Sequence, residues 1–186
     1  MIKGRSGVGK TTLLHVLAGL KPPQSGTLQW FGKTIDAHQV ADTTLARSQN
    51  MAFVYQDFQL VRGLSALENV MLPMALHGME QAKERATEWL NRLDLTDRHQ
   101  HLPDALSGGE QQRVGLARAL AMAPRVIFAD EPSGQLDDQT SIQLLEHLQT
   151  LKTSTQTTWV ICTHDDRFLT LASHAFTLQE GQLTPL

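Results

Sequence analysis

A glycine-rich segment near the start of the chain constrains the fold more than any other feature of the sequence. Residues 4–11 read Gly-Arg-Ser-Gly-Val-Gly-Lys-Thr, and apolar residues at helical spacing follow at once. Glycines at these intervals let successive backbone N–H groups turn inward around an anion, and the helix start adds the positive end of its dipole. The pattern therefore predicts a phosphate-binding loop that opens a helix. A glycine-rich turn that only caps an ordinary helix is the alternative interpretation.

The rest of the chain alternates between helix-like and strand-like patterns. Helices are expected where apolar residues recur every three or four positions, which occurs after Lys10, over much of 65–105, over 108–122 and around 142–148. Residues 27–56 favour short strands around a poorly patterned stretch at 42–50, and continuous apolar runs indicate buried strands at 126–129 and 159–162. A closing hairpin is expected at Glu180-Gly181. This order predicts an α/β fold with a mostly parallel sheet and helices on both faces.

Composition limits the partners that such a domain can have. The 186 residues are 41% hydrophobic and 19% charged, with a formal net charge of −3, which is typical of one globular domain. A protein that recognises nucleic acid through bulk charge carries excess positive charge, so no direct nucleic-acid partner is expected. No apolar run approaches the length of a membrane-spanning helix, and the first residues lack the apolar segment of a signal peptide. We therefore expect a cytoplasmic protein whose membrane association depends on a partner.

Three residues of types that often occur in redox or metal sites have simpler interpretations. The single cysteine, Cys162, ends an apolar run and is interpreted as a small buried residue rather than as a redox group. His99 and His101 lie in a polar loop that lacks the further ligands a zinc site needs.

Two acidic residues, Asp130 and Glu131, follow the apolar run 126–129 directly. Ligands of α/β proteins gather at the carboxyl ends of the strands, and two adjacent carboxylates are costly unless a cation lies beside them. The pair therefore favours a metal site, with Asp130 holding Mg²⁺ directly or through water and Glu131 polarising an attacking water. A strand end with two solvated acids is the alternative.

A second segment predicts a helix start that can bind an anion. Residues 106–113 read Leu-Ser-Gly-Gly-Glu-Gln-Gln-Arg, in which Ser107 and Glu110 form a capping box and two glycines expose N–H groups. Paired glycines weaken a helix start unless something approaches closely, so a well-capped helix alone does not explain Gly108 and Gly109. Two copies arranged head to tail do explain them. The loop 4–11 of one copy would hold ATP while Ser107, Gly108 and Gly109 of the other close over its γ-phosphate.

Together these motifs resemble the ABC ATPase family over essentially the whole chain. GRSGVGKTT resembles the Walker A motif, LSGGEQQR the signature motif, and VIFADE a Walker B motif with its catalytic glutamate. Gln56 resembles the Q-loop glutamine, the segment 133–137 resembles the D-loop, and His164 resembles the switch histidine. The resemblance implies one domain over 1–186 with a P-loop NTPase (RecA-like) core at 1–56 and 106–186. It also implies a small helical ABC subdomain at 57–105.

The resemblance further implies a Mg²⁺-dependent ATPase with defined residue roles. Catalysis is assigned to Glu131, to His164, which orients the water of Glu131, and to Gln56, which relays the nucleotide state to the helical segment. Lys10 is implied to reach the β- and γ-phosphates, and Asp137 to touch the partner's P-loop. The residues implied to bind ATP are Gly4, Arg5, Ser6, Gly7, Val8, Gly9, Lys10, Thr11, Thr12, Ser107, Gly108, Gly109 and Asp137. Those implied to hold Mg²⁺ are Thr11, Gln56 and Asp130.

Residues 66–74 and the stretch FVYQDFQL are similar to one branch of the family, the ATPases of lipoprotein release, macrolide export and the cell-division complex. This branch implies a peripheral subunit on the cytoplasmic face of the inner membrane. It would pair head to tail with an identical copy or another ATPase subunit beneath an integral-membrane permease, and would drive export or extraction. The segment 57–105 would contact the permease. A soluble ABC ATPase in DNA or translation work, or an inactive subunit that binds nucleotide weakly, is the alternative.

The chain departs from the family at its start. Only Met1, Ile2 and Lys3 precede Gly4, whereas family members carry a longer segment there, with strands and an aromatic residue that stacks on adenine. We therefore expect the N-terminal strands and the adenine-stacking loop to be missing, with weaker nucleotide binding and lower stability than in a full-length relative. Tyr55 is interpreted as a strand residue that packs near Gln56 and not as the adenine contact.

Overall fold

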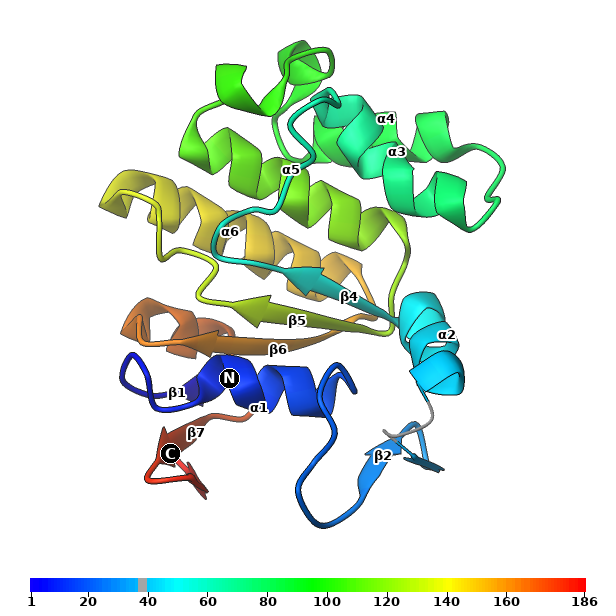
Figure 1. Ribbon diagram of the computed structural model, residues 1–186. Helices are drawn as coiled ribbons and strands as arrows, with labels where there is room; N and C mark the ends of the chain where they lie inside the picture. Colours follow the sequence, from blue (N-terminus) through cyan, green and yellow to red (C-terminus); the bar gives the residue numbers. More distant parts are fainter. Residues whose placement is uncertain (37–39) are drawn as a thin grey trace.

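The computed structural model describes residues 1–36 and 40–186. A six-stranded sheet has the order β4-β5-β6-β1-β7-β8, and its neighbouring strands are parallel except for β7 with β8. The strands are β1 (Ile2–Lys3), β4 (Met51–Val54), β5 (Val126–Asp130), β6 (Thr158–Thr163), β7 (Phe176–Gln179) and β8 (Gln182–Pro185). The mostly parallel sheet predicted from the sequence is confirmed (Figure 1).

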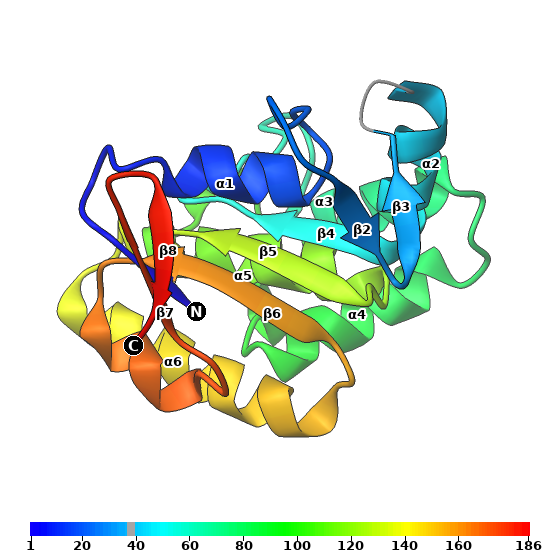
Figure 2. The same ribbon diagram turned by 90° about the horizontal axis from the view of Figure 1, so that it is seen from below.

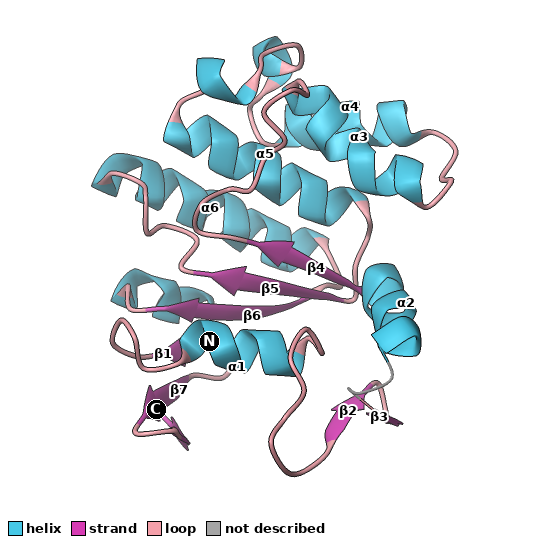
Figure 3. Ribbon diagram, viewed as in Figure 1, coloured by secondary structure: helices cyan, strands magenta, loops and turns pink. Residues whose placement is uncertain are grey.

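Helices cover both faces of this sheet, as the alternation of elements predicted (Figure 2). α1 (Lys10–Leu17) lies on one face, and α5 (Gly108–Ala121) and α6 (Asp138–Ser154) lie on the other. α3 (Ala66–Leu76) and α4 (Ala82–Arg92) pack on α5 on the side away from the sheet (Figure 3). The described residues also form the short 3-10 helices η1 (Thr96–Arg98), η2 (Pro103–Ala105) and η3 (Asp166–Leu171).

Two hydrophobic cores, one on each face, explain why the central strands are continuous apolar runs. Along β5, Ile127 and Ala129 belong to the core that contains α5 and α6, whereas Phe128 between them belongs to the core that contains α1. Because side chains of a strand point alternately to the two faces, a strand covered on both faces must be apolar at successive positions. The predicted buried strand at 126–129 is therefore confirmed.

Residues 40–50 form a helix, α2 (Val40–Asn50), that the sequence did not predict. The short strands expected on either side of the poorly patterned stretch are present as β2 (Leu28–Trp30), β3 (Lys33–Ile35) and β4. The pattern of 42–50 is too weak to predict an element, although the stretch contains residues of high helix propensity, such as Leu45, Ala46 and Arg47.

The helix expected around 142–148 is confirmed as α6, but its buried face does not include every apolar residue of that stretch. Ile142 is 48% exposed. The buried residues of α6 are instead Ser141, Leu144, Leu148 and Leu151. Counting back from Leu148 in steps of four and three reaches Leu144 and Ser141, which is the spacing of one helix face.

The segment 57–105 forms a helical layer that joins the main core. Buried residues of α3 and α4 share one hydrophobic cluster with residues of α5, β5 and β6. The division of the chain into a RecA-like core and a helical subdomain stays a prediction. Within the described residues, the helices are all too short or too polar to cross a bilayer.

Candidate active site

The loop 4–11 joins β1 to α1 at the edge of the sheet where the parallel strands end (Figure 1). Gly7 and Gly9 have φ angles of 80° and 105°, a region that side chains other than glycine rarely adopt. The residue before α1 is Gly9, so no side chain caps the helix, and its first turn holds no acidic residue. The N–H groups at the start of α1 are therefore free of side-chain acceptors, which suits an anion.

The side chain of Lys10 is folded into this loop and is 5% exposed. Its Nζ atom donates to the carbonyl oxygens of Gly4 at 2.8 Å and Arg5 at 3.1 Å. The same ammonium forms an ion pair with Glu131 Oε1 at 2.8 Å. The lysine thus links the glycine-rich loop directly to the carboxyl end of β5.

Glu131 stands at a sharp turn that aims its carboxylate at the loop. Its φ angle is 44°, which is uncommon for a residue with a side chain, and its backbone N–H donates to Cys162 at the end of β6. The Oε2 atom lies 2.9 Å from Nδ1 of His164. Burial by itself would raise the pKa of Glu131, but the hydrogen bond and charge of Lys10, together with Thr163 and His164, bring that pKa below its ordinary value. The carboxylate is therefore ionised near neutral pH.

Asp130 and Thr11 provide oxygen atoms beside this pair. The hydroxyl of Thr11 donates to Asp130 Oδ2 at 2.5 Å, while Asp130 Oδ1 is buried and has no hydrogen-bond partner. A buried carboxylate oxygen without a partner is costly, and a hydroxyl beside a carboxylate is a suitable donor set for Mg²⁺. No cluster of three or more His, Cys, Asp or Glu side chains that could hold a metal occurs among the described residues. A bound Mg²⁺ would therefore need oxygen atoms from water and a ligand as well.

Gln56 follows β4 and lies against the turn that carries Glu131. Its Nε2 atom is 2.9 Å from the position that a Cβ on Gly134 would occupy, and the N–H of Gly134 donates to the carbonyl of Glu131 at 2.9 Å. The Gln56 side chain is exposed. The ring of the preceding residue, Tyr55, stacks on Phe53 at a centroid distance of 5.5 Å.

The loop after Gln56 is held by a residue that the sequence did not single out. Phe58 and Gln59 have φ angles of 59° and 46°, so two consecutive non-glycine residues adopt the left-handed region. Arg118 on α5 donates to both of their carbonyls, at 2.9 Å to Phe58 and 2.7 Å to Gln59. The helix that begins with Gly108 therefore determines the path of the chain beside Gln56. Consecutive positive φ angles at ordinary residues leave no signature in the sequence.

Ser107 and Glu110 form the predicted capping box at the start of α5. Glu110 Oε1 also accepts from Arg98 Nε at 2.7 Å. A Cβ on Gly109 would lie 2.3 Å from Cγ2 of Thr140 on α6, whereas one on Gly108 would meet nothing closer than 3.7 Å. The close approach expected from the paired glycines is thus made at Gly109 by the same chain. Ser107 is exposed, and packing within the chain does not explain Gly108.

Asp137 is the N-cap of α6. Its carboxylate accepts from the N–H of Thr140 at 2.9 Å and from the Thr140 hydroxyl at 2.7 Å. These hydrogen bonds to Thr140 lower the pKa of Asp137. The side chain is exposed beside the start of α5, so a role toward another chain would be additional to its role as a cap.

The structure therefore brings the expected site residues together in two groups. The first group surrounds the glycine-rich loop and consists of Gly4, Gly7, Gly9, Lys10, Thr11, Asp130, Glu131 and His164, with Gln56 beside it. Arg5, Ser6 and Thr12 are exposed around this loop, and Val8 packs beside Gly4. The second group, at the starts of α5 and α6, consists of Ser107, Gly108, Gly109 and Asp137.

Cys162 lies below the first group and is fully buried. Burial, followed by the charge of Asp130, raises the pKa of its thiol to about 12. The thiol therefore stays protonated and unreactive at neutral pH, in agreement with the interpretation of Cys162 as a buried strand residue.

Known proteins resemble the chain over most of its length. Residues 1–134 match the family described as ABC transporter. The ABC transporter ATP-binding protein YtrE of Bacillus subtilis (strain 168) is 39% identical over 184 residues, which are 98% of this chain and 80% of the relative. The lipoprotein-releasing system ATP-binding protein LolD 2 of Rhodopseudomonas palustris is 42% identical over 97% of this chain and 79% of the relative. The dimeric structure of the ATP-binding cassette MJ0796 with ADP and Pi is 34% identical, with a TM-score of 0.88, and covers 98% of this chain and 81% of that chain.

Proposed function

The chain belongs to the ABC transporter family of ATP-binding subunits, and on this premise we propose that it hydrolyses ATP at the glycine-rich loop in the presence of Mg²⁺. The observation that carries the proposal is the junction of Lys10 with Glu131. A buried ammonium at the start of a helix meets an ionised carboxylate at the end of the central strand. Phosphoryl transfer depends mainly on positioning and on charge stabilisation, and this junction supplies groups for both.

Each residue of the first group has a separate role in this proposal. N–H groups of the loop and the Lys10 ammonium bind the phosphates, so that an incoming nucleotide replaces Glu131 as the partner of Lys10. Glu131, still held by His164, then accepts a hydrogen bond from the attacking water and orients it. Thr11 and Asp130, with Gln56, would hold Mg²⁺, and the bound ion would supply positive charge beside the phosphate oxygens.

We propose that the second group acts on the nucleotide of another copy. Ser107 and Gly108 are not buried, and the packing of Gly109 on Thr140 sets them at the exposed start of α5. Residues 5–7 of the glycine-rich loop are likewise exposed. Two copies arranged head to tail would place each helix start over the partner's loop, where its N–H groups favour a γ-phosphate. The resemblance to a cassette that was solved as a dimer supports this arrangement.

Within the cell, we propose that the dimer works on the cytoplasmic face of the inner membrane beneath a permease, and that it drives export or extraction. The similarity to a lipoprotein-releasing ATP-binding protein supports this role. The helical layer of α3 and α4 would contact the permease. Co-purification with an integral-membrane protein after detergent extraction would support this part, whereas recovery as a free soluble dimer only would contradict it.

Hydrolysis is tested by phosphate release from the wild type, Glu131→Gln and Glu146→Gln. Glu146 is an exposed acid on α6 and serves as the matched control. Loss of a positioned base typically reduces the rate about 10²- to 10⁴-fold, so we expect a fall of this size for Glu131→Gln only. The same variant should form an ATP-dependent dimer in sedimentation experiments, and Ser107→Arg should abolish that dimer. Equal hydrolysis by both glutamate variants would refute the proposal.

A further inference from the structure

Gln112 on α5 is a buried polar residue whose side-chain amide makes no hydrogen bond. The residue is 1% exposed, and within the described part of the chain neither its Oε1 nor its Nε2 atom has a partner. Asn69 is also buried, but its amide bonds the backbone of the neighbouring loop. A buried amide without partners costs free energy, so Gln112 makes an unfavourable contribution to the folded chain.

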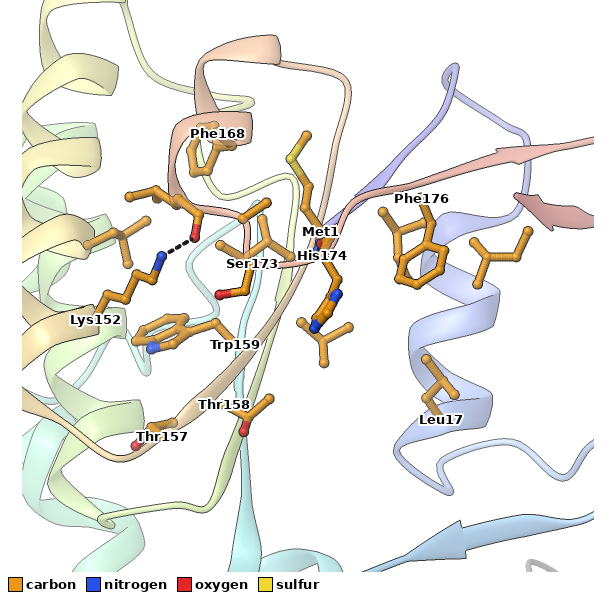
Figure 4. A pocket seen from close by; sticks show the side chains of 17 residues that line it. Met1, Leu17, Lys152, Thr157, Thr158, Trp159, Phe168, Ser173, His174 and Phe176 are labelled. Atoms are coloured by element: carbon orange, nitrogen blue, oxygen red, sulfur yellow. Dashed lines mark hydrogen bonds between the residues drawn. The ribbon is translucent and has the colours of Figure 1, made fainter. Parts of the chain in front are cut away.

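Trp159 offers a contrast that shows why Gln112 needs a partner from the protein. Its buried ring nitrogen also has no partner among the described residues. Trp159 lines a cavity of about 490 Å³ beside β6 (Figure 4), which is large enough for water that accepts its hydrogen. Gln112 does not line this cavity and is almost fully enclosed. A protein group is therefore the partner to expect for its amide.

Two glycines of α5 show what surrounds Gln112. Gly108 precedes it by four positions and Gly115 follows it by three, so the three residues share one face of the helix. A Cβ on Gly108 would lie 3.7 Å from the Phe58 ring and 3.8 and 3.9 Å from atoms of the segment 133–137. A Cβ on Gly115 would lie 3.6 Å from the Phe58 carbonyl. Gln112 is therefore enclosed where α5 meets the loop after β4 and the segment 133–137.

The segment 133–137 carries the backbone groups that the Gln112 amide lacks. Neither the N–H nor the carbonyl of Gln135 is hydrogen-bonded within the described residues, and the residue is exposed. Its carbonyl oxygen lies 3.9 Å from the position of a Cβ on Gly108, one helical turn from Gln112. A turn rises about 5.4 Å, most of which a glutamine side chain spans. Because Gly108 has no side chain, the segment has room to move closer to α5.

We propose that Gln112 is a positioning residue whose amide binds the backbone of Gln135 when two copies close on ATP. The inference rests on the proposed head-to-tail dimer, in which Asp137 at the end of the same segment contacts the partner. Closure moves Gln135 out of water toward α5, where its backbone and the Gln112 amide satisfy each other. The free monomer bears the cost of the unpaired amide and the dimer does not. Gln112 therefore shifts the equilibrium toward the ATP-bound dimer.

The variant Gln112→Met tests this proposal through two effects of opposite sign. Methionine is similarly long and flexible and has no amide to satisfy, so the Tm of the nucleotide-free chain should rise by about 2–4 °C. The same change removes the group that binds Gln135 in the dimer. The dimer should therefore weaken about tenfold for each copy, or about 100-fold for the pair. A residue that only supports the fold would lower both the Tm and the stability of the dimer.

Dimerisation is measured by sedimentation with ATP in the Glu131→Gln background, in which turnover is slow. Gln149→Met is the matched control, because Gln149 is an exposed glutamine on α6, and Gln112→Leu is a second apolar replacement. The affinity of each monomer for ADP should not change, because the glycine-rich loop is untouched. At protein concentrations that saturate the dimer, the amide hydrogen of Gln135 should exchange faster in Gln112→Met than in the control.

The outcomes separate this inference from the proposed function. A Tm lowered by both Gln112→Met and Gln112→Leu, or a dimer as tight as that of Gln149→Met, would overturn the inference and leave the proposed dimer intact. Equal exchange of the Gln135 amide in the two dimers would overturn it as well. If Glu131→Gln alone forms no dimer with ATP, the proposed head-to-tail arrangement fails and the inference fails with it.

Discussion

Arg118 is expected to control both the stability of the protein and the position of Gln56. Its guanidinium donates to the carbonyls of Phe58 and Gln59, the two residues with left-handed backbones. Hydrogen bonds from charged groups contribute about 1.5–3 kcal/mol each, so the pair contributes about 3 kcal/mol at the low end. Burial lowers the pKa of Arg118, which means that burying the charge offsets part of this gain. We therefore expect Arg118→Met to lower the free energy of unfolding by about 2 kcal/mol.

The effect of Arg118→Met on catalysis shows whether Arg118 positions Gln56 or only stabilises the fold. Without Arg118 the loop can relax to ordinary backbone angles, and Gln56 then leaves its place beside Gly134. The residues that we propose to bind the phosphates belong to other elements, so KM for ATP should change little while kcat falls about tenfold or more. Arg118→Lys, which keeps the charge but cannot reach two carbonyls with a planar fork, should show an intermediate fall in kcat.

The assay combines urea unfolding, followed by circular dichroism, with steady-state hydrolysis well below the unfolding transition. Arg62→Met is the control, because Arg62 is an exposed arginine in the following loop. An Arg118→Met variant that unfolds within about 0.5 kcal/mol of the wild type and keeps its kcat would refute the reasoning. A loss of stability with unchanged kcat would refute the positioning role.

Two further predictions concern buried polar groups. Asn69 is fully buried and bonds the backbone of Val61, Leu64 and Ser65, so Asn69→Leu should lower the free energy of unfolding by about 3 kcal/mol. A change below about 1 kcal/mol in urea unfolding would contradict this. Lys10 holds the pKa of Glu131 below its ordinary value in the folded protein, despite the opposing effect of burial. The contribution of this carboxylate to stability is therefore present above that ordinary value and is lost as the pH falls through the folded-state pKa. The wild type should therefore lose more stability than Glu131→Gln between about pH 5 and pH 3, and parallel losses would show that the carboxylate contributes nothing.

Several parts of the fold and site could be predicted because their signals are local. The apolar run 126–129 and the S-x-x-E box of Ser107 each determine structure within a few residues. Ser65 and Glu68 form the same kind of box at the start of α3, and the same signal could have found it. The helix at 40–50 was not predicted because its apolar residues follow neither the two-residue spacing of a strand nor the three-to-four-residue spacing of a helix clearly.

The contacts that complete the site could not be read from local patterns. The ion pair of Lys10 with Glu131 joins residues from the two halves of the chain, and only the neighbouring positions of β1, β6 and β5 in the sheet bring them together. The packing of Thr140 on Gly109 depends on the placement of two helices. A glycine in the sequence shows that space is needed but not which residue occupies it.

The contact of Gly109 with Thr140 also has a mechanical consequence. Since even one added carbon would collide there, the starts of α5 and α6 cannot move closer together at this point. The start of α6 connects through 133–137 to Glu131, and the start of α5 carries Ser107. We therefore expect that a movement of the start of α6 toward α5, set off at the turn of Glu131, would press on Gly109 and displace the neighbouring Ser107 at the outer face of the molecule.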